Sequence, residues 1–99
     1  MLKVFTVCPQ GLGSSMIAKI HVRSVLDKLG IENEVETAGV ASIVGETFDL
    51  IVTVDALKDS LKHIDPQKII FITNFFKKDE IEKKLTEKVE ELRKEGNDI

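Results

Sequence analysis

Short apolar runs predict three buried β-strands, at residues 2–7, 49–53 and 68–72. Each run is rich in β-branched or aromatic side chains and is nearly continuous, which suits a strand that is covered on both faces. Residues 34–37 form a more polar run that alternates Glu with Val and Thr, and they predict a weaker strand at a sheet edge.

Apolar residues at helical spacing predict helices between and after these strands. The first helix is expected from Ser14 to Leu29, with Ser14 or Ser15 as its cap and Gly30 as its stop. Residues 40–45 predict one or two helical turns. A further helix is expected from an Asp55 cap to Leu61 or Lys62, before the break at Pro66. Residues 77–94 predict a long charged helix with an apolar stripe at Ile81, Leu85, Val89 and Leu92.

The resulting order βαβαβαβα predicts an α/β fold with a parallel sheet. With the first strand in the interior, the expected strand order is 2-1-3-4, a small doubly wound, flavodoxin-like fold with helices on both faces. In such sheets ligands bind at the carboxyl ends of the strands, where the winding reverses. Residues 1–95 are expected to form one domain, and residues 96–99 a frayed tail.

Composition narrows the function classes. The chain has 99 residues, 42% of them hydrophobic and 31% charged, as in ordinary globular proteins. Its net charge of −3 argues against nucleic-acid binding. No run has the length of a bilayer span, and the first residues do not resemble a signal peptide. The single cysteine excludes an internal disulfide, so we expect a cytoplasmic protein.

That cysteine, Cys8, follows the first strand and opens a glycine-rich turn before the first helix. Gly11 and Gly13 permit close approach of the backbone to a ligand, and successive N–H groups in such a turn bind anions. Ser14 and Ser15 add hydroxyl donors. The positive end of the helix also stabilises a thiolate, so the pKa of such a cysteine falls from about 8.5 into a range of roughly 3.5 to 7.5.

A lone cysteine is often only a small buried hydrophobic residue, and we would prefer that interpretation if Cys8 lay in the middle of a strand. At the end of a strand we favour a nucleophile that attacks phosphorus, with backbone and hydroxyl donors stabilising the phosphoryl oxygens. This chemistry requires no metal and no cofactor. His21 and His63 have no partner at metal-ligand spacing, so we expect no metal site.

The string Cys8-x-x-Gly11-Leu12-Gly13-Ser14-Ser15 resembles the active-site loop of enzyme IIB components of the phosphoenolpyruvate-dependent sugar phosphotransferase system (PTS), most closely the ascorbate and galactitol branches. The resemblance implies that Cys8 is the phosphorylated nucleophile. It implies a phosphate-binding loop made of Gln10, Gly11, Leu12, Gly13, Ser14 and Ser15. Pro9 departs from the family pattern, because it removes one N–H from this loop.

The resemblance also implies partners and a reaction. A IIA protein donates the phosphoryl group from a phosphohistidine, and Cys8 passes it to an ascorbate-like or galactitol-like sugar that the membrane IIC component binds. The activity would be that of a protein-N(π)-phosphohistidine–sugar phosphotransferase. The protein would be cytoplasmic, and would meet the inner face of the membrane transiently through IIC.

Two other functions share this architecture. The first is a low-molecular-weight tyrosine-phosphatase-like enzyme with Cys-x5-Arg, but residue 14 is serine and the only arginines are Arg23 and Arg93. The second is a flavin- or nucleotide-binding module, which the absence of Trp and Tyr disfavours. A thiol redox role lacks a second cysteine.

Four further residues follow the third and fourth strands and are expected near Cys8: Asp55, Asn74, Phe75 and Phe76. Asp55 is interpreted as a helix cap. For the two phenylalanines, two arrangements remain open. Either both pack under the last helix, or one is exposed and forms an apolar contact surface for IIA and IIC with Leu12 and Met16.

Overall fold

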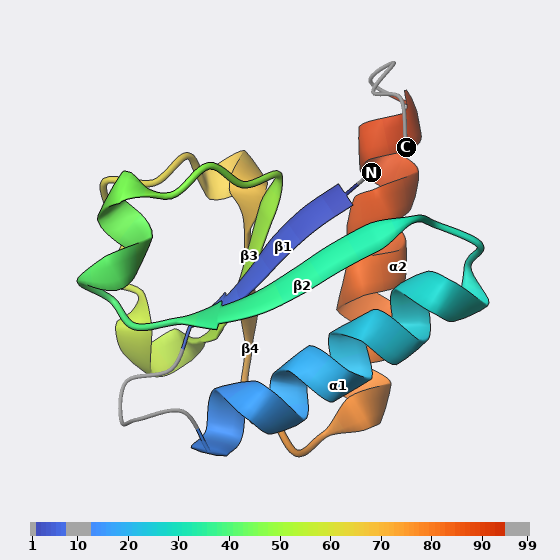
Figure 1. Cartoon of the computed structure of the whole chain (residues 1–99), viewed down its shortest axis with the longest axis horizontal. Coiled ribbons are helices and arrows are strands. Elements are labelled where there is room, and N and C mark those ends of the chain that lie inside the picture. Colours follow the sequence, from blue (N-terminus) through green and yellow to red (C-terminus); the bar gives the residue numbers. More distant parts are fainter. Residues whose placement is uncertain (1, 8–12, 95–99) are drawn as a thin grey trace.

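In a computed structural model of the chain, which describes residues 2–7 and 13–94, four parallel strands form one sheet (Figure 1). The strands are β1 (Leu2–Val7), β2 (Asn33–Ala38), β3 (Leu50–Val54) and β4 (Ile69–Ile72). The α-helices are α1 (Gly13–Lys28) and α2 (Lys78–Lys94), and the 3-10 helices are η1 (Ser42–Gly45), η2 (Asp55–Leu57) and η3 (Pro66–Lys68). The strand order is β2-β1-β3-β4, so the predicted doubly wound α/β fold is confirmed.

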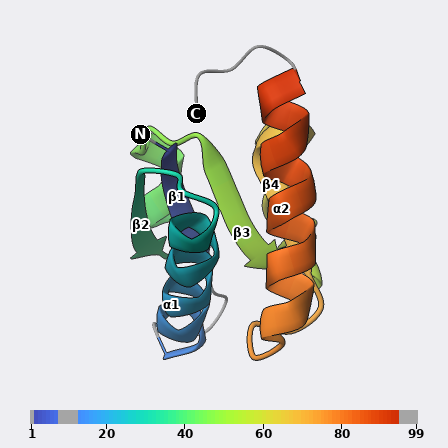
Figure 2. The same ribbon diagram turned by 90° about the vertical axis from the view of Figure 1, so that its right-hand side faces the viewer.

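The first face of the sheet packs against both α-helices, which lie side by side in front of the strands in Figure 2. The apolar stripe predicted for α2 supplies three buried residues, Ile81, Leu85 and Val89. They share one core with residues of α1 such as Val22 and Leu26. Burial of such stripes is the main source of stability for helices of this length.

The second face of the sheet is covered by short segments instead of long helices. Its core contains Phe5 and Ile51 from the strands, and Ile43, Leu57 and Leu61 from η1, η2 and the turn that follows. Phe48 packs on this core, and its ring is perpendicular to that of Phe5, at 6.4 Å between ring centroids. Helical structure therefore covers both faces, but α-helices cover only one.

The prediction of a continuous helix from Asp55 to Leu61 or Lys62 is wrong. Only η2 is helical, and turns follow it, with separate backbone bonds such as Lys58 N–H to Asp55 O and Leu61 N–H to Leu57 O. An eight-residue segment is too short to form a helix without strong packing. Asp55 is not a cap either, because it is the first residue of η2 and no side-chain bond caps that helix.

The first helix begins and ends close to the predicted residues. It starts at Gly13, so Ser14 and Ser15 lie within its first turn and not at the cap position that we predicted. At its other end Gly30 has φ of +73°, the left-handed conformation that glycine tolerates best. The N–H groups of Gly30 and Ile31 bond to the carbonyls of Asp27 and Leu26, which is a Schellman cap.

Candidate functional site

The carboxyl ends of all four strands lie at one end of the molecule, at the bottom of Figure 1. At this end β1 finishes at Val7 and α1 begins at Gly13. Cys8, Gln10, Gly11 and Leu12 of the predicted loop fall between them and lie outside the described residues, as does Pro9. The elements on either side therefore agree with the sequence-based prediction of a strand–loop–helix unit at the strand where the winding reverses.

The start of α1 is directed at this end of the sheet. Gly13, Ser14 and Ser15 form its first turn, although only their backbone belongs to the described structure. The first N–H groups of a helix have no intrahelical acceptor and carry the positive end of its dipole. Those of a 16-residue helix are suited to an anion, and α1 has no acidic residue in its first turn to compete for them.

A buried threonine contacts the last residue of β1. Thr53 in β3 is completely buried, and its Oγ1 donates a hydrogen bond of 2.9 Å to the Val7 carbonyl. The sequence analysis did not single out this residue. The sequence could have pointed to Thr53, because it is the one polar side chain within the apolar run Leu-Ile-Val-Thr-Val. A hydroxyl that is buried in such a strand requires a hydrogen-bond partner.

The loop from β4 to α2 settles the question of the two phenylalanines. The Asn74 side chain accepts a hydrogen bond of 2.8 Å from the Phe76 N–H, and the Asn74 carbonyl accepts one from Lys77 N–H. This tight turn directs successive side chains in opposite directions. Phe75 is 3% exposed and belongs to the helix-side core, whereas Phe76 is 62% exposed. Phe76 is thus exposed to solvent, so the arrangement in which both phenylalanines pack under the last helix is wrong.

Glu80 in the first turn of α2 anchors the beginning of the same loop. Its Oε2 accepts hydrogen bonds of 3.0 Å from both the backbone N–H and the hydroxyl of Thr73, and pairs with Lys84 at 3.2 Å. Burial by itself raises the pKa of Glu80, but the bonds from Thr73 and Lys84 and the Lys84 charge outweigh it. The pKa is lowered below its ordinary value of 4.5.

Lys84 also donates a bond of 2.6 Å to the Phe71 carbonyl. Thr73 follows β4 and Phe71 lies within it, so two side chains of α2 occupy polar backbone groups along this edge strand. Unpaired groups on an edge strand are a template for association with other chains. The Glu80–Lys84 pair therefore both protects the edge and fixes where the loop that carries Phe76 begins.

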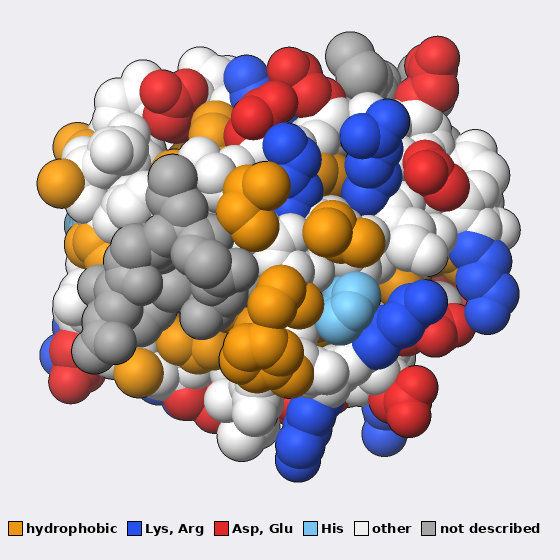
Figure 3. All heavy atoms as spheres, turned by 60° about the horizontal axis from the view of Figure 1, so that its bottom comes forward, with side chains coloured by type: hydrophobic (Ala, Val, Ile, Leu, Met, Phe, Trp, Pro, Cys, Tyr) orange, Lys and Arg blue, Asp and Glu red, His pale blue; other side chains and the backbone are white. Residues whose placement is uncertain are grey.

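Hydrophobic side chains are exposed on the face of the molecule that Figure 3 shows. Among the described residues, the large ones are Met16 and Ile20 on α1, Phe76 after β4, and Val44 in η1. Met16 is 44% and Ile20 is 64% exposed, and their spacing of four residues puts them on one face of α1. We call Met16, Ile20 and Phe76 the rim residues.

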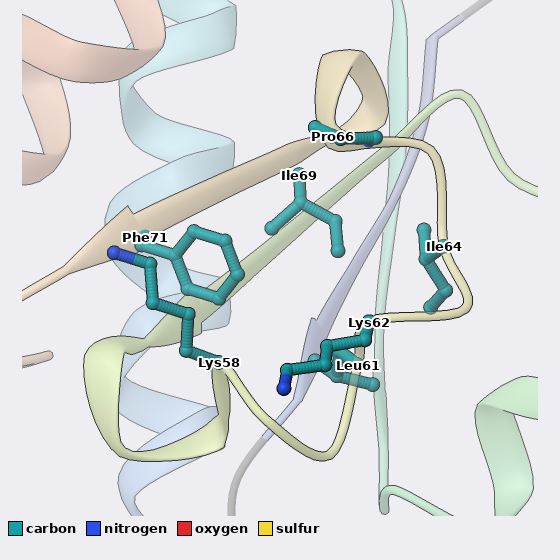
Figure 4. A pocket seen from close by; sticks show the side chains of 7 residues that line it. All are labelled: Lys58, Leu61, Lys62, Ile64, Pro66, Ile69 and Phe71. Atoms are coloured by element: carbon teal, nitrogen blue, oxygen red, sulfur yellow. The ribbon is translucent and has the colours of Figure 1, made fainter.

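The second face of the sheet carries a hollow of about 240 Å³ (Figure 4). Its lining consists of Lys58, Leu61, Lys62, Ile64, Pro66, Ile69 and Phe71. It lies where the predicted third helix is replaced by turns, and Lys58 Nζ stands 5.6 Å from the Phe71 ring centroid. The lining is mostly apolar, and its polar groups are the two lysine amines of Lys58 and Lys62.

Within residues 2–7 and 13–94, no three His, Cys, Asp or Glu side chains are grouped so as to hold a metal ion. His63 is exposed, and His21 is half-buried, with an Nδ1 that lacks a hydrogen-bond partner. No helix in the described part of the chain is both long and apolar enough to cross a membrane.

The fold is that of small α/β domains that include both phosphotransferase components and phosphatases. The structure resembles the lactose-specific IIB domain of the Streptococcus pneumoniae PTS, with a TM-score of 0.62 and 17% identity over 90% of this chain and 95% of that one. It equally resembles a low-molecular-weight protein tyrosine phosphatase from Bacillus subtilis, with a TM-score of 0.62 and 14% identity over 97% and 100% of the two chains. At these identities the likeness defines the fold alone.

Sequence similarity distinguishes between the two classes. The family described as "PTS system, Lactose/Cellobiose specific IIB subunit" matches residues 3–87. The chain is also 26% identical over 87 residues to the ascorbate-specific PTS EIIB component of Mycoplasma pneumoniae, a match that covers 86% of this chain and 92% of that protein. The chain belongs to the PTS IIB family, and is thus a component of a sugar phosphotransferase system.

Proposed function

We propose that this protein carries a phosphoryl group on Cys8, which it receives from a phosphohistidine of a IIA protein and passes to a sugar bound by a membrane IIC component. The observation that carries this proposal is the position of the only cysteine of the chain. Cys8 follows directly on Val7, the last residue of β1, and precedes the N-terminus of α1 at the strand where the winding reverses.

The transfer consists of two in-line displacements at phosphorus. The Cys8 thiolate attacks the phosphorus, the S–P bond forms, and the P–N bond breaks with its electron pair returning to the imidazole of the donor. A sugar hydroxyl then attacks the phosphocysteine, loses its proton to solvent or a base, and releases the thiolate. The phosphate-binding loop that we propose consists of Gln10, Gly11, Leu12, Gly13, Ser14 and Ser15, and its donors stabilise the phosphoryl oxygens in both steps.

The positions of the two arginines support a carrier over a phosphatase. Arg23 is exposed and lies ten residues into α1, about 15 Å along the helix axis from Gly13 at 1.5 Å per residue. Arg93 is in the last turn of α2, at the opposite end of that helix from the Phe76 loop. Without a guanidinium to bind the phosphate in a bidentate manner, hydrolysis is slow and the phosphocysteine persists until an acceptor arrives.

The rim residues are the contact surface that we propose for IIA and IIC. Met16 lies in the first turns of α1 and Phe76 follows β4, so both are close in sequence to the carboxyl end of the sheet, and Ile20 lies one turn further along α1. Both partners must bring a reacting group to one sulfur, so they use the same surface in turn and each complex is transient. Exposed apolar groups beside a reactive centre are typical of such interaction sites. Leu12, also predicted there, lies outside the described residues.

For the sugar we propose an ascorbate-like or galactitol-like substrate. The Gly-Leu-Gly-Ser-Ser element supports this, as does the similarity to the ascorbate-specific component of Mycoplasma pneumoniae. The description of the family names lactose and cellobiose, so these two sugars are the alternative substrates to test. Uptake of labelled ascorbate, galactitol, lactose and cellobiose into vesicles with matching IIC proteins distinguishes between them.

The experiment that tests the carrier mixes the protein with IIA that has been phosphorylated from phosphoenolpyruvate. We expect an iodine-labile adduct on the wild type, located at Cys8 by peptide mass spectrometry, and no adduct on Cys8→Ser. Circular dichroism of both proteins excludes unfolding as the cause of a loss. Phosphorylation of Cys8→Ser would overturn the mechanism. Rapid turnover of an aryl phosphate by the wild type would favour the phosphatase instead.

A further inference from the structure

We propose that Thr53 is a positioning residue for the Cys8 nucleophile, an inference that rests on the proposed carrier function. Its hydroxyl holds the Val7 carbonyl and, through the planar peptide unit, sets the direction in which the chain leaves β1 towards Cys8. Thr53 does not contact the reacting atoms in this proposal. It acts through the one peptide unit that joins Val7 of β1 to Cys8.

The contact lies where the backbone pairing of the two central strands ends. β1 and β3 pair at Val4 with Leu50, Phe5 with Ile51 and Thr6 with Val52, and the last of these pairs immediately precedes Val7 and Thr53. At the next position the Thr53 hydroxyl bonds to the Val7 carbonyl at 2.9 Å. A side chain therefore continues the connection between the strands one residue beyond the paired register.

The bond is made where it is strong and hard to replace. Thr53 has no exposed surface, and Val7 is likewise completely buried. Loss of a donor to a buried carbonyl leaves that carbonyl without its partner, whereas an exposed carbonyl would bond to water. As a β-branched residue in a strand, Thr53 also has a restricted χ1, which holds its hydroxyl in one direction.

Planarity of the peptide unit connects this bond to the nucleophile. The carbonyl of one residue and the amide of the next lie in one plane, and rotation about the bond between them is strongly hindered. A fixed Val7 carbonyl therefore fixes the plane of the following amide. In-line transfer depends steeply on placement, because a displacement of 1 Å can reduce a rate by about 100-fold.

A conservative substitution at the same position provides a matched control. Thr53→Val removes the hydroxyl from a completely buried position and keeps the size of the side chain. Thr53→Ser retains the hydroxyl and removes only a methyl group.

The first measurement needs no partner protein. It is the pH profile of Cys8 alkylation by iodoacetamide in Thr53→Val, Thr53→Ser and the wild type. We expect Thr53→Val to move the midpoint of the profile upward, because a misdirected thiolate loses stabilising donors. Thr53→Ser should retain the wild-type midpoint. The second measurement is the rate of phosphorylation by phosphorylated IIA. It should fall about 10-fold or more in Thr53→Val and recover in Thr53→Ser.

The possible outcomes separate the two proposals. An unchanged Thr53→Val profile and rate, or equal changes in Thr53→Ser, would overturn the role of Thr53 and leave the carrier intact. A shifted alkylation profile in a protein that IIA cannot phosphorylate would support the role of Thr53 and overturn the carrier. Urea unfolding of each variant shows that the compared proteins are folded. If Thr53→Val does not fold, Thr53→Ala replaces it under the same criteria.

Discussion

One face of the sheet packs against two long α-helices, whereas the opposite face is covered by 3-10 helices and turns. The helix face has residues such as Leu26 and Leu85 with no exposed surface. The turn face has the hollow of about 240 Å³ between Leu61, Ile64 and Phe71. The comparison indicates that the helix face provides most of the stability, while the turn face leaves part of its apolar surface incompletely packed.

The two faces share one functional end. All four strands terminate at the carboxyl end of the sheet, where α1 begins and Phe76 is exposed. A carrier needs a rigid scaffold behind its nucleophile and accessible groups in front of it. The helix face supplies both α1 and the loop that presents Phe76, so we expect perturbation of this face to reach the site more directly.

The largest expected effect comes from removal of one leucine from each face. Leu85→Ala on the helix face should reduce the free energy of unfolding by about 3–5 kcal/mol, because two packed helices cannot collapse into the cavity. Leu61→Ala should cost about 2 kcal/mol, because its neighbours border a hollow and a turn that can adjust. Urea denaturation measures both. An equal cost at the two sites would contradict the difference in packing between the faces.

Addition of volume should sharpen the same comparison. Val89→Phe inserts a ring into the tightly packed helix face and should destabilise the protein by about 1–3 kcal/mol. Ile64→Phe directs its added atoms at the hollow, and we expect a change within about 0.5 kcal/mol. Thermal unfolding of the two variants beside the wild type tests the prediction. It would be wrong if Ile64→Phe were the more destabilising substitution.

A further expected effect concerns Glu80 and pH. Its pKa is lowered in the folded protein, so the folded state holds this group deprotonated at pH values where the unfolded chain binds a proton. The stability that it contributes is therefore complete above the ordinary value of 4.5 and is lost as the pH falls through the lower pKa of the folded state. Glu80→Gln should cost about 1 kcal/mol at pH 7.

Urea titrations from pH 7 to pH 3 measure this contribution. The difference in the free energy of unfolding between wild type and Glu80→Gln should narrow as the pH falls below 4.5. Glu87→Gln, at an exposed position of the same helix, is the matched control and should show little pH-dependent difference. A constant difference for Glu80→Gln across this range would mean that the carboxylate charge is not what stabilises the Thr73 contact.

The sequence was most informative where a periodic pattern coincides with burial. The apolar stripe of α2 predicted the residues that pack on the sheet, and Gly30 predicted the end of α1. The residues from Asp55 to Pro66 were harder to predict. Leu57, Leu61 and Ile64 have helical spacing, yet the segment is short and Pro66 follows an extended Asp65 with ψ of 120°. Such a segment adopts whatever turns bury its leucines.

What the sequence determined by itself was the parallel α/β topology and the position of a single cysteine between β1 and α1. Both follow from local patterns: strands and helices alternate, and the loop residues are consecutive in the chain. Tertiary structure alone decided that Phe76 and not Phe75 is exposed, and that Thr53 bonds to Val7, 46 residues away along the chain. Hydrogen bonds that connect distant residues depend on strand register, which no local pattern contains.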